Sequence, residues 1–253
     1  MDLTAATYRM MSEDRNSLDQ PVGSLLPDWA VPLHPDKAVI EGEWCRLEPL
    51  DPARHAASLY AANMLDEDGL NWTYLPYGPF SSAVEYTSWM RQVCLGKDPL
   101  FFAMIESSTQ EALGVASYLR IKPECGSIEV GHINYSPRLQ RTRAATEAMF
   151  LMMEHAFELG YRRYEWKCHA LNAPSRMAAQ RLGFSFEGIF RQATVVKGRN
   201  RDTAWFSIID SEWPMLKEAY ASWLSPTNFD EEGKQRVRLS DLTRPILKAV
   251  FPS

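Results

Sequence analysis

The sequence predicts a mixed α/β domain, and three observations carry that prediction. Apolar residues make up 45% of the 253 residues and charged residues 23%, which is the balance of an ordinary globular chain. Strand-type and helical patterns follow in the order strand, helices, three strands, helix, strand, helix and hairpin. Consecutive strands are expected to pair antiparallel, whereas strand–helix–strand units cross over in parallel. We expect the domain to span residues 37–224, with an extended arm at residues 1–36 and a tail at residues 225–253.

The N-terminal half of the domain carries clear helix starts. Asp51 followed by Pro52, and Ser82 followed by Glu85, are typical first-turn sequences. The loop at residues 71–80 between the two helices is dense in aromatic residues. The elements expected here are a hairpin of residues 38–40 and 45–50, a helix from residue 52 through 60, a helix from residue 83 through 94, and strands at residues 100–106, 113–121 and 127–135.

The C-terminal half begins with a long apolar helix, which we expect to lie buried against a sheet. Gly160 and Gly183 are placed as helix stops, and Asn172 as a helix cap. The elements expected here are helices at residues 144–159, 173–182 and 212–223, a strand at residues 164–169, a hairpin of residues 186–196 and 202–210, and a short helix near residues 244–250.

The charge balance argues against a polymeric anion as the partner. Lys and Arg number 27 against 32 Asp and Glu, for a net charge of −5, and the basic residues form local clusters. Such clusters on an acidic chain fit a small anionic ligand, so we expect no nucleic-acid partner.

Cysteine usage and hydropathy bear on the compartment. The four cysteines include no Cys-x-x-Cys pair, so we expect neither a metal site nor disulfides, and free thiols fit a reducing compartment. There is no apolar run of about 20 residues and no signal-peptide pattern. The sequence therefore predicts a cytoplasmic protein with no membrane partner, with a nuclear location left open.

Residues 129–148 predict a phosphate-binding site. A strand turns at Ser136-Pro137, crosses a loop that contains Arg138, Arg141 and Arg143, and enters the long helix. The first amides of a helix lack internal partners, and the helix dipole favours negative charge there. We therefore expect a phosphorylated ligand at this loop.

Four segments in this order resemble the GCN5-related N-acetyltransferase (GNAT) family, and within it the ribosomal-protein-alanine N-acetyltransferase branch. The segments are Glu129-Val130-Gly131, residues 140–148, Asn172-x-x-Ser175 and Arg181-Leu182-Gly183-Phe184-x-x-Glu187-Gly188. The resemblance covers about residues 38–214. It implies a GNAT fold, which is a mixed, centrally splayed sheet with flanking helices.

The resemblance implies acetyl-coenzyme A as the phosphorylated ligand, with no metal. It assigns the pyrophosphate to the loop and helix start, the pantetheine arm to the gap beside the preceding strand, and two side-chain contacts to the next helix. The implied cofactor residues are Ile133, Asn134, Tyr135, Gln140, Arg141, Thr142, Arg143, Ala144, Ala145, Asn172 and Ser175. Arg141 and Arg143 stand where the family usually has glycine, so each needs an allowed backbone conformation and a side chain turned outward or onto a phosphate.

The implied reaction is direct attack of an amine on the acetyl thioester, which needs a base. Glu129 and His132 are the candidates, with His169 as a third. Glu129 and His132 are three residues apart, so on a regular strand they face opposite sides unless a bulge intervenes. The tyrosine that many family members use as an acid is replaced by Ala179.

The acceptor stays open between a small-molecule primary amine and a protein or peptide N-terminus. Trp72 and Tyr74 are the candidate acceptor-binding residues. An acidic, aromatic pocket formed by Asp66, Glu67, Asp68 and the Trp72 loop would favour a cationic small amine, whereas an open groove would favour a peptide. We expect a monomer or a homodimer. The alternative function is a non-catalytic module that senses acetyl-coenzyme A or scaffolds a partner.

Overall fold

The structure is a computed structural model in which residues 14–252 are described, and it forms two compact units. The first unit ends at Val31, and its described part contains a small hairpin of β1 (Asp14–Arg15) and β2 (Pro21–Val22). The second unit begins at Pro32 and contains every other helix and strand described here. Residues 1–13 of the expected arm, and Ser253 of the expected tail, lie outside the described residues.

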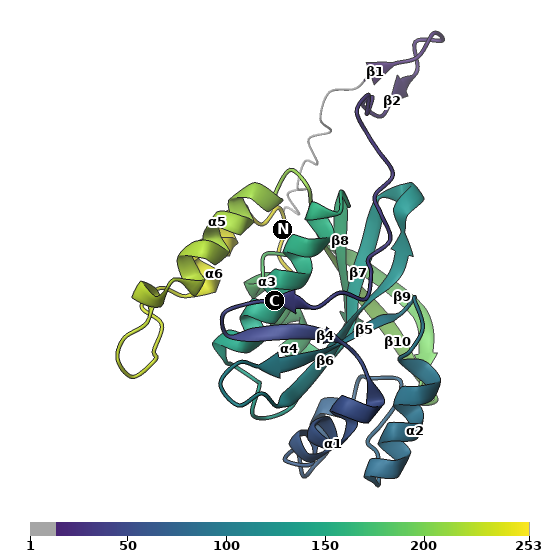
Figure 1. Cartoon of the computed structure of the whole chain (residues 1–253). Helices are drawn as coiled ribbons and strands as arrows, with labels where there is room; N and C mark the ends of the chain where they lie inside the picture. The colour runs from purple at the N-terminus through teal and green to yellow at the C-terminus, as the bar shows by residue number, and fades with distance from the viewer. Residues whose placement is uncertain (1–13, 253) are drawn as a thin grey trace. The chain divides into compact units, whose positions relative to one another are not determined.

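The second unit is built on one eight-stranded sheet with the order β3-β4-β5-β6-β7-β8-β10-β9 (Figure 1). Its one parallel pair among the described strands is β7–β8, and the others are antiparallel. The strands are β3 (Ile40–Glu41), β4 (Cys45–Pro49), β5 (Leu100–Glu106), β6 (Ala112–Lys122), β7 (Ser127–Tyr135), β8 (Arg163–His169), β9 (Ser185–Val196) and β10 (Arg199–Ile209). The expected mixed α/β class is confirmed.

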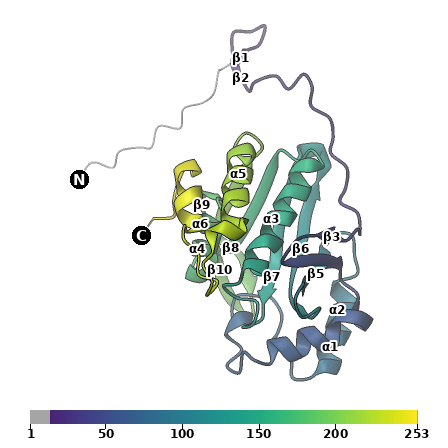
Figure 2. The same cartoon turned by 60° about the vertical axis from the view of Figure 1, so that its left-hand side comes forward.

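Helices cover the two faces of the sheet unequally (Figures 1 and 2). On one face α3 (Arg143–Glu158), α4 (Ala173–Arg181) and α5 (Trp213–Leu224) bury the larger hydrophobic core. On the other face α1 (Pro52–Asn63) and α2 (Ala83–Val93) bury a second core against β5 and β6. We call the first the α3 face and the second the α1 face. The side chains of β7, β8 and β10 on the α1 face carry charged groups, described below.

A buried carboxylate ties α3 to the first hairpin. Glu147 accepts hydrogen bonds of 2.7 to 2.9 Å from the backbone amides of Glu43, Trp44 and Cys45. Three charge-assisted bonds from backbone donors hold the carboxylate in place despite its burial. A Cβ on Gly42 would lie 2.7 Å from the Cys45 carbonyl oxygen and from Glu147 Oε2, so this turn requires glycine.

The C-terminal segment differs from the expected peripheral tail. Residues 225–252 belong to the same compact unit as the sheet and contain η3 (Pro226–Asn228), α6 (Leu239–Thr243) and η4 (Arg244–Ile246). Leu239 is buried in the larger core, and the Phe186 amide donates to the Ala249 carbonyl. The segment was expected to be peripheral because most of its residues are charged or polar, and only a few apolar side chains anchor it. The short helix expected near residues 244–250 corresponds to η4, and α6 precedes it directly.

Two short single-turn segments complete the unit, η1 (Leu70–Trp72) and η2 (Pro123–Cys125). None of the helices within residues 14–252 is long and apolar enough to cross a membrane.

Candidate functional site

The two parallel strands at the centre of the sheet separate along their length. β7 and β8 pair from Ser127 with Arg163 to Val130 with Trp166, and pairing ends there although both strands continue. Beyond Val130, β7 pairs with β6 on its other side and with no further strand of residues 14–252. The edge of β7 from Gly131 to Tyr135 therefore faces a gap rather than a strand. We call this gap the splay.

A β-bulge at the start of the splay reorients β7. Gly131 pairs with Ser117 and Asn134 with Val115, so His132 and Ile133 together oppose a single residue of β6. His132 takes a positive φ of 52°, a conformation that non-glycine residues seldom adopt outside constrained sites. Ile133 packs on the core of the α3 face, whereas the His132 ring lies 5.0 Å from that of Phe101 in the second core. Glu129 and His132 consequently share the α1 face, the exception that the sequence analysis had allowed for.

Glu129 lies in a buried ionic cluster. Its carboxylate is 4% exposed, with Arg120 Nη1 2.7 Å from Oε1 and Lys167 Nζ 2.7 Å from Oε2. Burial raises the pKa of the Glu129 carboxyl, and the Lys167 and Arg120 charges oppose that rise. With a cation against each oxygen, Glu129 has little capacity left to accept a further proton.

His132 is a neutral imidazole in a mostly aromatic environment. Its Nδ1 lies 3.0 Å from the Tyr77 hydroxyl, and the two rings stack with centroids 5.6 Å apart. Burial, together with the charges of Arg120 and Arg201, lowers the pKa of His132 to about 4. His169 is placed differently, at the end of β8, where its Nδ1 accepts from the Leu171 amide.

The aromatic loop spans the mouth of the splay. Asn71 and Gln140 both donate to the Tyr135 carbonyl at 3.1 Å, and Gln140 also donates to Asn71. The Tyr74 hydroxyl donates to the Leu171 carbonyl just beyond β8. The tip of the β9–β10 hairpin reaches the same loop, because Lys197 Nζ donates to the Trp72 carbonyl at 2.7 Å. The loop therefore bridges β7, β8 and β10.

Trp72 and Tyr74 have different roles in this loop. The Tyr74 ring lies 5.2 Å from that of His169, at the splay. The Trp72 side chain is only 5% exposed and packs in the second core. The structure thus supports Tyr74, but not the Trp72 ring, as a contact for an acceptor in the splay.

The N-terminus of α3 follows the loop at the end of β7 and has free backbone amides. Thr142 caps the helix by accepting from the Ala145 amide, which leaves the Arg143 and Ala144 amides without a hydrogen-bond partner in residues 14–252. Arg141 takes a left-handed conformation with a φ of 63°, as the glycine-like position requires. These free amides suit an anion.

The side chains of Arg143 and Arg138 contact partners away from the helix N-terminus. The Arg143 guanidinium carbon lies 3.4 Å from the Phe229 ring centroid and 4.6 Å from that of Trp44. Arg138 pairs with Glu111 at 2.6 Å on the surface. Arg143 can replace a glycine because its side chain turns outward and only its backbone remains at the helix N-terminus.

Asn172 and Ser175 are occupied by local bonds. Asn172 caps α4 by accepting from the Ser175 amide, and the Ser175 hydroxyl accepts from Trp166 Nε1 at 3.0 Å. By contrast, Asn134 is 3% exposed, and both its side-chain polar atoms lack a partner within the described chain. A buried amide without partners in the splay is a fitting contact for a polar ligand.

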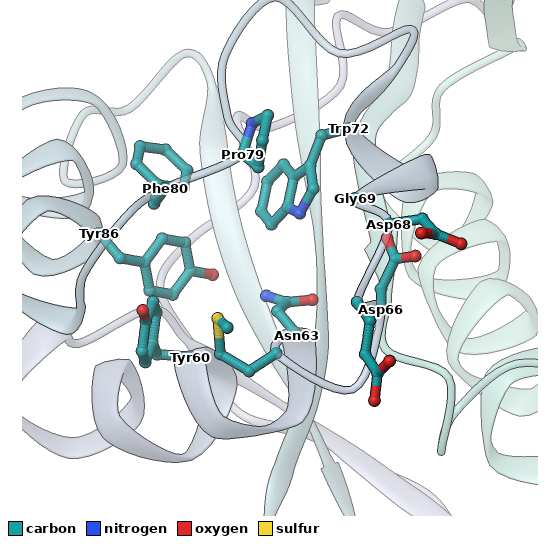
Figure 3. Close-up of a pocket in the computed structure, with 11 residues that line it drawn as sticks. Tyr60, Asn63, Asp66, Asp68, Gly69, Trp72, Pro79, Phe80 and Tyr86 are labelled. Carbon is teal, nitrogen blue, oxygen red and sulfur yellow. The ribbon is translucent and has the colours of Figure 1, made fainter.

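A pocket of about 220 Å³ lies between α1, α2 and the aromatic loop. Figure 3 shows the carboxylates of Asp66 and Asp68 on one side of it and the rings of Phe80 and Tyr86 on the other. The Trp72 and Tyr77 rings separate this pocket from His132, because Trp72 packs edge-on against Tyr77 and Tyr77 stacks on His132. The expected acidic, aromatic pocket is thus present, but it does not open onto the splay.

No group of metal-binding residues was found in the part of the chain that the structure describes. Sequence reasoning missed Lys167 and Arg201 as site residues, and it considered Tyr77 only as one of the aromatic residues of the loop at residues 71–80. The alternation of residues 164–169 placed Lys167 on a strand, whereas Arg201 lay one residue before the expected strand of residues 202–210. Only the sheet order brings β8 beside β7 and β10 beside β8.

A family model described as an acetyltransferase (GNAT) domain matches residues 45–185. The chain belongs to the GNAT family of acetyltransferases. This membership and the relatives below make the chain an acyltransferase.

Two solved GNAT structures are similar over most of the chain. A GCN5-related N-acetyltransferase from Brucella melitensis is 47% identical, with a TM-score of 0.84 over 87% of this chain and 100% of that one. A probable acetyltransferase from Chromobacterium violaceum is 44% identical, with a TM-score of 0.72 over 77% of this chain and 98% of that one. These likenesses confirm the GNAT fold.

More distant relatives agree with this assignment. An uncharacterized N-acetyltransferase, p20, from Bacillus licheniformis is 27% identical over 139 residues, or 54% of this chain and 78% of p20. RimL, a ribosomal L7/L12 protein acetyltransferase solved in complex with coenzyme A, is 21% identical with a TM-score of 0.56 over 69% of this chain and 99% of that one. At that identity RimL shows a shared fold.

Proposed function

We propose that this GNAT enzyme transfers the acetyl group of acetyl-coenzyme A to a primary amine by direct attack. The observation that carries the proposal is the splay itself: an unpaired strand edge that includes a neutral histidine leads into a helix N-terminus with free amides. A strand edge suits the amides of a pantetheine arm, and the free helix amides suit a pyrophosphate.

The residues of the splay fit this cosubstrate. The Arg143 and Ala144 amides would hold phosphate oxygens, and the edge of β7 at residues 133–135 would hold the pantetheine arm. The Asn134 side chain, buried without a partner in residues 14–252, supplies a further donor and acceptor. When bound, acetyl-coenzyme A supplies an activated acetyl thioester.

His132 is the better candidate base on this geometry. Its Nε2 has no hydrogen-bond partner in the described residues, whereas both oxygens of Glu129 face cations. When Nδ1–H donates to the Tyr77 oxygen, Nε2 carries the lone pair that accepts a proton from the attacking amine. The lowered pKa keeps the ring unprotonated, and therefore available, at neutral pH.

The decisive experiment measures thiol release from acetyl-coenzyme A with a panel of amines and N-terminal peptides, together with calorimetric binding of coenzyme A. We expect binding and amine-dependent thiol release. Binding without turnover on every amine would support the sensor or scaffold alternative. Ala179 in the place of the family tyrosine, and Arg141 and Arg143 in the place of glycines, motivate that alternative. Absence of coenzyme A binding would contradict both functions.

Three earlier expectations stay predictions. These are the resemblance to the ribosomal-protein-alanine branch, a cytoplasmic location, and a monomeric or homodimeric state. Size-exclusion chromatography with light scattering would decide the last.

A further inference from the structure

A set of side chains from three strands meets on the α1 face of the splay. His169 of β8 pairs with Thr203 of β10, and Lys167 pairs with Trp205, so the four side chains share one face. Lys167 Nζ lies 3.7 Å from the Trp205 ring centroid, which confirms that orientation. Arg201 precedes Thr203 on β10, across a bulge, and lies beyond the paired part of β8. Arg201 therefore stands at the open end of the splay.

Among the side chains on the strands of this face, the charges balance except at Arg201. The carboxylates lie within 2.5 to 2.7 Å of cationic nitrogens, in a cluster made of Glu129, Glu165 and Glu187 with Arg120, Arg163 and Lys167. Three carboxylates thus face three cations. Arg201 takes part in no ion pair and no side-chain hydrogen bond with the described residues, and its Nε is buried.

An unpaired, partly buried guanidinium is costly to the folded chain unless something pairs with it. Its planar fork of donors matches a carboxylate in two parallel bonds. Burial, then the charges of Arg120 and Arg201, lower the pKa of His132, and burial, then Arg201, lowers that of His169. The positive charge of Arg201 thus lowers the pKa of both histidines beside the splay. An acceptor amine would react beside these histidines.

We propose that the acceptor is a small amine that also carries a carboxylate, such as an amino acid, and that Arg201 binds this carboxylate. The inference rests on the proposed acetyl transfer and names the class of its acceptor. Arg201 holds the acceptor by its anionic end, and the amine then lies toward His132.

The same charges argue against a cationic acceptor. The acidic pocket of Asp66 and Asp68 is separated from His132 by the Trp72 and Tyr77 rings. The carboxylate nearest to His132 along β7, Glu129, is already paired with Arg120 and Lys167. The unbalanced charge on this face is positive.

The test compares each amino acid with its own carboxamide, which keeps the amine and side chain but removes the negative charge. We expect the wild type to favour the amino acid in kcat/KM by at least about tenfold, the usual contribution of a charge-assisted hydrogen bond. Arg201→Gln should abolish the preference, and Arg201→Lys should restore part of it. Arg199→Gln, an exposed arginine on the same hairpin, serves as the matched control and should change nothing.

A second measurement is independent of turnover. Calorimetry with coenzyme A present compares N-acetyl amino acids with their carboxamides as product-like ligands. Tighter binding of the acid by the wild type but not by Arg201→Gln supports the proposal even where no amine is acetylated, so it is decided separately from the proposed function. Equal binding and equal turnover of acid and carboxamide would overturn it. A preference for succinyl-coenzyme A over acetyl-coenzyme A that depends on Arg201 would also overturn it. In that case the carboxylate bound by Arg201 would belong to the acyl group and not to the acceptor.

Discussion

The Tyr77 hydroxyl lies 3.0 Å from Nδ1 of His132, and the two rings stack at an interplanar angle of 13°. This pair joins the aromatic loop to the bulge of β7, which are 55 residues apart in the chain. Burial raises the pKa of Tyr77, so its hydroxyl remains protonated and can either donate or accept. Tyr77 therefore holds the orientation of the His132 ring and can accept from Nδ1–H, which is the tautomer that leaves the Nε2 lone pair free.

Variants of His132 and Tyr77 should separate loss of the general base from loss of the hydrogen bond that orients it. We expect His132→Ala to lower kcat by roughly 10² to 10⁴, as loss of a general base does. Tyr77→Phe keeps the stack and should lower kcat by up to about tenfold, the value of one neutral hydrogen bond. Tyr86→Phe is the control, since Tyr86 lies in the same aromatic cluster without bonding to His132. If His132→Ala retained full kcat at unchanged KM, the base would have to be sought elsewhere.

The depressed pKa of His132 makes stability depend on pH in a defined direction. Its folded pKa of about 4 lies below the unfolded value of 6.5, so the unfolded chain binds the proton more readily between these values. The stability due to the neutral ring is fully present above pH 6.5 and is lost as pH falls toward 4. Urea unfolding of wild type and His132→Asn at several pH values in this window isolates the effect from the other histidines. We expect the stability advantage of the wild type to shrink with acidification, and a constant difference would contradict the assignment.

The two cations on Glu129 should contribute very differently to stability. The Lys167 side chain is 7% exposed and that of Arg120 is 55% exposed, although each lies 2.7 Å from an oxygen of the same carboxylate. Lys167→Met leaves buried carboxylates short of a partner and should cost about 3 to 5 kcal/mol. Arg120→Met removes a solvent-screened pair and should cost about 1 kcal/mol or less. Chemical denaturation of both variants is the measurement. Equal losses in the free energy of unfolding would show that the burial of a cation does not determine its contribution to stability.

Replacing the Arg143 side chain should lower the stability of the fold but leave the affinity for coenzyme A nearly unchanged. Its guanidinium packs on Trp44 and Phe229, so Arg143→Ala should cost about 1 to 2 kcal/mol through two cation–π contacts. The Kd for coenzyme A should change by less than about threefold, because the backbone amide carries the anion contact. Arg138→Ala, which breaks an exposed pair with Glu111, is the control for charge alone. A tenfold or greater loss of affinity specific to Arg143→Ala would instead place its side chain on a phosphate.

Local patterns were sufficient for most of the fold. The strands at residues 100–106 and 127–135 have the expected bounds, and Thr142, Asn172 and Ser82 cap helices within a residue or two of the predicted starts. These features depend on periodicity and on caps, which act over a few residues. The C-terminal segment was misjudged because a few buried contacts, such as that of Leu239, outweigh its charged composition.

By itself, the sequence determined the mixed α/β class, the order of the elements and the helix N-terminus at the start of α3, because periodicity, caps and helix termini are local. Only the tertiary structure decided the rest of the site. The bulge at His132 turned two residues of one strand onto the same face. The sheet order set Lys167 beside Glu129 and left Arg201 without a partner among the described residues. Such relations depend on which strands become neighbours and on where their pairing stops, and contacts between distant segments decide both.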